Sequence, residues 1–209
     1  MMGMRFYRKA LPMVFLMAVL LVACRSSTPV EFYTLNSIST ETQRANPVDG
    51  DRNIVVGVGP VQLPQVLDRP QIITRTGPNT LTLNEFHRWA GSLQADFSRV
   101  LAENIAALLA IDQVVVYPWE IDFTPDYRIA VDVMRFEGQW GKSVILDVIW
   151  KIADRSGQKI LAVKKSVITE PLSAEDYETL VATESRAIAQ LSREIVQQIR
   201  QLQSEVKSN

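Results

Sequence analysis

The chain has 209 residues, of which 47% are hydrophobic, and its 22 Lys and Arg residues nearly balance its 23 Asp and Glu residues. This length and composition predict a single folded domain with a substantial core. No block of basic residues is present outside the first ten positions. The sequence therefore argues against a nucleic-acid partner, because such partners are bound by clustered Lys and Arg side chains.

The first 23 residues have the layout of a secretory signal peptide. Three basic residues, Arg5, Arg8 and Lys9, precede an apolar run from Leu11 to Ala23. This run is shorter than the roughly 20 apolar residues that a bilayer-spanning helix needs. We therefore expect residues 1–23 to be cleaved off rather than kept as a transmembrane anchor.

The apolar run ends in Leu21-Val22-Ala23-Cys24, which resembles the lipobox of bacterial lipoproteins. In such signals the bond between Ala23 and Cys24 is cut, and Cys24, the only cysteine of the chain, carries lipid such as palmitate. Two acyl chains suffice for stable anchoring. Arg25 follows Cys24 where the inner-membrane retention signal has Asp. We therefore expect anchoring to the outer membrane, on its periplasmic face.

The remaining chain is predicted to have three parts. Residues 24–30 form a lipidated tether, residues 31–203 form a single α+β domain, and residues 204–209 form a frayed tail. Apolar runs and period-2 alternation predict strands over 31–35, 54–58, 71–75, 80–83, 114–117, 128–135, 144–153 and 159–168. The segment Gly77-Pro78-Asn79 predicts a hairpin between two of them.

Two amphipathic helices are expected beside these strands. Apolar residues recur every three or four positions from Trp89 to Leu108, and again from Leu180 to Leu202. Ser173 is the predicted N-cap of the second helix. Together these elements predict an α+β two-layer sandwich: a mostly antiparallel sheet with both amphipathic helices packed on one face.

The sequence contains no recognisable catalytic or metal-binding motif. It has one histidine, His87, and lacks HExxH, GxSxG and a glycine-rich phosphate loop. Glu85 and His87 form a pair that could serve acid–base chemistry, but a surface cluster at a helix entry is favoured. We therefore expect a protein that is not an enzyme, with no catalytic residue, no metal and no cofactor other than the lipid on Cys24.

Four residues are candidates for docking a partner, because Trp, Tyr and Arg are enriched among interface anchors. Phe86, Arg88 and Trp89 lie at the expected helix entry, and Trp140 lies in a turn between Gly138 and Gly141. Trp89 is also in phase with the apolar stripe of the helix. Trp140 could equally fold back on the sheet, so both alternatives stay open.

Over almost its full mature length the chain resembles the PqiC/YmbA-type auxiliary lipoproteins of ABC and MCE transport systems. The resemblance rests on the order of several segments. These are the lipobox, Phe32 to Leu35, Val56 to Pro64 followed by Leu67, Ile72 to Thr76, Arg88 to Ala90, Arg128 to Val133, Phe136 to Gly138 and the long last helix.

The resemblance implies a non-enzymatic, outer-membrane subunit of a system that moves phospholipid between membranes and supports outer-membrane integrity. Its implied partners are an inner-membrane permease and a periplasm-spanning MCE protein. A closed homo-oligomer is a further expectation, because closed symmetric assemblies are common. The alternative is a periplasmic binding or assembly lipoprotein, such as an activator of a cell-wall synthase or a helper of lipopolysaccharide assembly.

Overall fold

The computed structural model describes residues 28–38, 54–119 and 123–208. The predicted signal peptide, its cleavage site at Ala23 and the lipidation site at Cys24 lie outside the described residues. The chain divides into two units, Met1–Val30 and Glu31–Asn209, and the second contains all the strands and helices that the structure describes.

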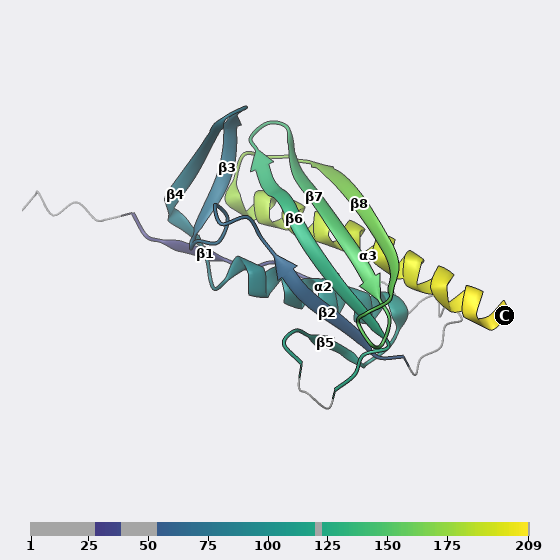
Figure 1. Cartoon of the computed structure of the whole chain (residues 1–209). Coiled ribbons are helices and arrows are strands. Elements are labelled where there is room, and N and C mark those ends of the chain that lie inside the picture. Colours follow the sequence, from purple (N-terminus) through teal and green to yellow (C-terminus); the bar gives the residue numbers. More distant parts are fainter. Residues whose placement is uncertain (1–27, 39–53, 120–122, 209) are drawn as a thin grey trace, which may run out of the picture. The chain divides into compact units, whose positions relative to one another are not determined.

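In the described part of the second unit, eight strands form one sheet around the long central strand β6, Tyr127–Gln139 (Figure 1). One edge of β6 pairs with β7, which in turn pairs with β8. The other edge pairs with β2 along the first half of β6 and with β3 near its end. β5 adds to β2, whereas β4 adds to β3 and β1 adds to β4. The remaining bounds are β1 Glu31–Tyr33, β2 Val56–Gln62, β3 Gln71–Gly77, β4 Thr80–Trp89, β5 Val114–Val116, β7 Ser143–Ala153 and β8 Ile160–Pro171.

The prediction of an α+β fold is confirmed, but a mostly antiparallel sheet is not. Of the seven strand pairings in the described residues, β1–β4, β2–β5, β2–β6 and β3–β6 are parallel. Only the pairings β3–β4, β6–β7 and β7–β8 are antiparallel. These three join neighbours in the sequence through tight turns and therefore leave a local signal. The parallel pairings join distant segments and leave none.

Both helices pack against the same face of the sheet (Figure 1). Helix α2, Leu93–Leu109, contacts β2 and β5, whereas helix α3, Tyr177–Ser208, contacts β6, β7 and β8. The two helices also contact each other. Between them and the sheet lies the core, in which the rings of Phe97 and Phe136 meet edge to face with centroids 5.4 Å apart. No described helix covers the opposite face of the sheet.

The start of α2 differs from the prediction. Trp89 is the last residue of β4, where its backbone N–H donates to the carbonyl of Pro70 at 2.7 Å. The helix begins four residues later, and Ser92 caps it by accepting a hydrogen bond from the backbone of Ala95. Trp89 fitted the helical stripe by its spacing, yet it reaches the core from a strand.

The ends of α3 also differ from the prediction. Asp176, and not Ser173, caps the helix: its Oδ1 accepts a hydrogen bond from the backbone N–H of Thr179 at 2.7 Å. A carboxylate at this position also complements the helix dipole. At the other end the helix continues to Ser208, so the residues expected to fray are helical where the structure describes them.

A buried ion pair fastens the β3–β4 hairpin to β6. The backbone pairing between β3 and β6 has the single register pair Thr74 and Gly138. Beside it, Arg75 donates to both carboxylate oxygens of Glu137, at 2.5 and 3.1 Å, and Arg135 donates to the same carboxylate at 3.0 Å. Burial would raise the pKa of Glu137, but the hydrogen bonds from the two arginines outweigh it and lower the pKa below its ordinary value. The carboxylate therefore stays charged in its buried position.

Gly138 sets how closely α3 approaches the sheet. A Cβ atom at this position would overlap Leu180 Cδ1 of α3, and Leu180 is fully buried. Both residues lie in the packed core, where an added methyl group forces side chains or backbone to move.

Gly138→Ala should therefore lower the free energy of unfolding by about 1–3 kcal/mol, measured by urea denaturation. Gly91→Ala is the matched control, because nothing lies within 4 Å of the added Cβ, and we expect a change within about 0.5 kcal/mol. Adding Leu180→Ala should relieve the overlap, so the double variant loses less than the sum of the two single losses. Strict additivity would show that this contact does not limit the packing of α3.

Candidate docking surfaces

The structure separates the four predicted docking residues. Phe86 is 44% exposed, and the side chain of Arg88 is one-third exposed. Trp89 is only 6% exposed and belongs to the core, so it offers no anchor to a partner. Trp140 packs partly buried against the core, with its ring edge to face with that of Tyr177 at 5.1 Å. Only Phe86 and Arg88 therefore remain as neighbouring surface residues.

The pairing of β1 with β4 places a further residue, Phe32, beside these two. Phe32 lies opposite Arg88 in the ladder, and its side chain is 65% exposed. Residues opposite each other in a parallel ladder point the same way, so Phe32 and Arg88 share one face of the two strands. Phe86 precedes Arg88 by two residues, in a part of β4 where the register against β3 shifts. The exposure of Phe32 was not predictable from the sequence, because β1 is too short to show an alternation and its parallel partner lies far along the chain.

The other face of β1 and β4 carries a cluster of polar aromatic side chains. The hydroxyl of Tyr33 lies 2.8 Å from His87 Nδ1 and donates to Glu31 Oε2 at 2.6 Å. The ring of His87 stacks on that of Tyr177 at the start of α3, with centroids 3.9 Å apart. Burial, together with the hydrogen bond to Glu31, raises the pKa of Tyr33, so this phenol keeps its proton. The cluster fastens β1 to both β4 and α3.

The Glu85 and His87 pair identified in the sequence is divided between two networks. Glu85 accepts hydrogen bonds from Gln71 and Arg88, at 3.1 and 3.0 Å, whereas His87 contacts Tyr33 and Tyr177. Both residues lie on β4 and not at a helix entry. In the described ranges, no three His, Cys, Asp or Glu side chains gather as metal ligands would. Glu85 therefore supports the β3–β4 hairpin, whereas His87 supports the attachment of β1.

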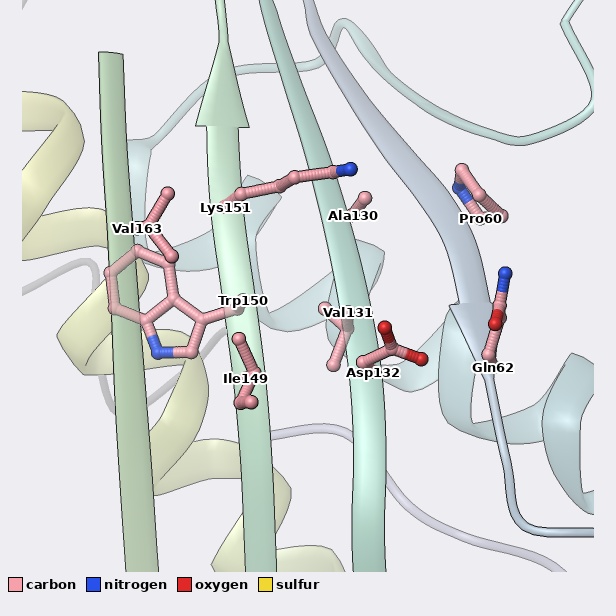
Figure 2. Close-up of a pocket in the computed structure, with 9 residues that line it drawn as sticks. All are labelled: Pro60, Gln62, Ala130, Val131, Asp132, Ile149, Trp150, Lys151 and Val163. Carbon is pink, nitrogen blue, oxygen red and sulfur yellow. The ribbon is translucent and has the colours of Figure 1, made fainter. Parts of the chain in front are cut away.

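The uncovered face of β6, β7 and β8 is a second surface. Val163 is 62% exposed, Val167 is similarly exposed, and Ile149 is 42% exposed. A shallow pocket of about 230 Å³ spans this face and the neighbouring β2 (Figure 2). Figure 2 shows the side chain of Lys151 reaching from β7 across β6 toward Pro60. The lining residues are Pro60, Gln62, Ala130, Val131, Asp132, Ile149, Trp150, Lys151 and Val163.

The lining of this pocket is mostly apolar, with charged residues at its margin. Its two charged residues, Asp132 and Lys151, flank apolar side chains and are themselves exposed. Beside it, Lys165 and Asp147 form an ion pair with a separation of 3.3 Å. An apolar centre with polar and charged residues around it is the usual composition of a protein interface.

Glu184 is a buried carboxyl group that belongs to neither surface. It lies on α3, is only 2% exposed, and its Oε2 atom has no hydrogen-bond partner among the described residues. Burial raises its pKa to about 8 from the ordinary value of 4.5. In the folded protein the group is therefore neutral at pH 7.

This pKa predicts a pH-dependent stability. Below pH 4.5 the carboxyl is protonated in both states, so its contribution is fully present. Between 4.5 and about 8 only the unfolded chain releases the proton, which costs roughly 1 kcal/mol of stability per pH unit. We expect Glu184→Gln to remove this loss, measured by urea denaturation across the range. The control is Glu175→Gln, at an exposed position, and equal slopes for wild type and Glu184→Gln would contradict the assignment.

Comparison with known proteins identifies the class. Residues 33–196 match the family of ABC-type transport auxiliary lipoprotein components, and the chain belongs to this family. The resemblance to PqiC/YmbA-type lipoproteins is thereby confirmed at the level of the family. The chain is thus a lipoprotein that serves as an auxiliary component of ABC-type transport. No curated protein matches it significantly.

Two crystal structures share the fold. A protein from Xanthomonas campestris superposes with a TM-score of 0.67 at 20% identity, covering 84% of this chain and 99% of its own. An uncharacterized protein superposes with a TM-score of 0.65 at 18% identity, covering 82% of this chain and 99% of its own. Within the residues that the structure describes, neither helix is both long and apolar enough to cross a membrane.

Proposed function

We propose that this lipoprotein is a non-enzymatic subunit of a system that carries phospholipid between the two membranes and supports outer-membrane integrity. In this proposal it is held by lipid on Cys24 at the periplasmic face of the outer membrane. There it receives a periplasm-spanning MCE protein whose other end meets an inner-membrane permease. The observation that carries the proposal is the uncovered apolar face of β6, β7 and β8 on a domain of this family.

This face supports docking because the paired strands that carry its apolar side chains have a fixed backbone geometry. Ile149 and Val163 project from two strands that pair over eleven register positions, so their geometry is fixed before a partner arrives. A preorganised surface loses little conformational freedom on binding. The buried acid Glu137 is engaged by two arginines, Glu85 is bonded within the β3–β4 hairpin, and His87 contacts Tyr33 of β1. These groups support a binding role over a catalytic one.

Replacing Ile149 and Val163 together by Gln should weaken docking about tenfold or more, because truncated central anchors typically cost at least 1 kcal/mol. The measurement is the affinity of the purified lipoprotein for the MCE protein. Leu83 and Val116, 40% and 39% exposed on other strands, provide the matched double Gln control. Both variants should melt like the wild type.

Two results would contradict this proposal. Unchanged affinity of the Ile149 and Val163 variant would place the docking surface elsewhere. A pull-down that recovers cell-wall synthases or lipopolysaccharide-assembly proteins instead of MCE and permease subunits would replace the function with the assembly role. A closed homo-oligomer stays a prediction, and mass by light scattering tests it.

Anchoring is tested separately at Cys24. Cys24→Ser removes the thiol that accepts lipid, so labelled palmitate should no longer be incorporated and the protein should leave the outer-membrane fraction. Arg25→Asp is the companion variant, which we expect to keep the label and move to the inner membrane. Palmitate incorporation into Cys24→Ser would show that lipid is attached elsewhere.

A further inference from the structure

Phe32 and Phe86 form an exposed aromatic pair that lies outside the candidate docking surface on β6, β7 and β8. The two side chains are 65% and 44% exposed. Phe32 lies on the face of β1 that points away from the Tyr33 and His87 cluster, and Phe86 lies directly before His87 on β4. Neither residue lines the pocket on β6, β7 and β8. Exposed apolar groups of this size commonly mark contact with another protein or with a membrane.

The covalent chain limits how far this pair can be from a membrane. Glu31, the first residue of β1, lies seven positions after Cys24. Fully extended, this segment spans at most about 25 Å. Phe32 follows directly and is fixed on β4 by the ladder that places it opposite Arg88. With lipid on Cys24, the aromatic pair therefore lies within reach of the bilayer surface.

We infer that Phe32 and Phe86 insert into the interfacial layer of the same lipid leaflet that holds the acyl chains of Cys24, and thereby orient the domain. This inference rests on the lipid anchoring proposed above. Arg88, opposite Phe32 and one-third exposed, is paired with Glu85 at 3.0 Å, so the face offers the membrane its two aromatic side chains rather than a free cation. A lipid surface matches these apolar groups.

The contact adds orientation rather than attachment. Lipid chains on one cysteine already hold the protein stably, so the aromatic pair contributes little to retention. A tether alone, however, lets the domain rotate about one point. A second contact through Phe32 and Phe86 removes most of this freedom. The face of β6, β7 and β8 then points in one direction relative to the membrane, which favours capture of a partner arriving from the periplasm.

The test uses single thiols on the full, lipidated protein. Because Cys24 carries lipid, a new cysteine is the only reactive thiol. Phe32→Cys and Val163→Cys have nearly equal exposure, 65% and 62%, and each is labelled with an environment-sensitive fluorophore. Both proteins are reconstituted in vesicles of phosphatidylethanolamine and phosphatidylglycerol. We expect the label at position 32 to shift to shorter wavelength and to be quenched by spin-labelled lipid, whereas the label at 163 keeps its aqueous emission. Adding Phe86→Glu should reverse the shift at position 32.

Each alternative has its own outcome. Aqueous emission at position 32 from protein that floats with the vesicles would overturn the membrane contact and leave the anchoring intact. A shift at position 32 without vesicles, accompanied by a higher mass, would assign the face to a second copy. A shift that appears only after the MCE protein is added would assign it to that partner. Failure of the protein to float would remove the anchor and this inference with it.

Discussion

The attachment of β3 to β6 through Arg75 and Glu137 is the constraint on which the arrangement of this domain depends. The backbone joins the two strands at one register pair, yet β3 carries β4, and β4 carries β1. The end of β1 is held a second time, because the backbone N–H of Leu35 donates to Asp96 of α2 and Tyr33 packs near Tyr177 of α3. Removing Glu137 would leave Arg75 and Arg135 without their shared acceptor, which is more costly than losing an exposed ion pair.

Because both helices pack on one face of the sheet, the other face of the sheet stays exposed. Gly138 lets α3 lie directly on the sheet, and both helices pack on that side, so the core is complete without the opposite face. In a sheet with one covered face, the inward side chains must fit the core, whereas core packing does not restrict the outward side chains. On β7 the inward side chains Leu146, Val148 and Trp150 are fully buried, whereas Ile149 is exposed. The same strand thus supplies both the core and the candidate docking surface.

The sequence predicted what is encoded locally. The hairpin around Gly77 and the meander of β6, β7 and β8 were predictable, because alternation and turn residues lie within a few positions of each other. The parallel pairings were not, since they depend on which distant strands meet. The unknown strand pairing also explains why two residues were assigned incorrectly or overlooked. Trp89 was assigned to a helix because its spacing fitted, and Phe32 was overlooked because its exposure arises only when β1 pairs with β4. The uncovered apolar face likewise required knowledge of where both helices pack.

The two exposed apolar surfaces are connected through a single element. β6 pairs along one edge with β7, which carries Ile149, and near its end with β3, which leads through β4 to Phe32 and Phe86. Every step of this path is a backbone ladder or a buried ion pair, with no flexible linker between them. In the proposed role the subunit holds a partner at a set place beside a membrane, and slack between the two surfaces would reduce the effective concentration of one for the other. In that role the sheet acts as a spacer, because its register fixes the relation of the two surfaces.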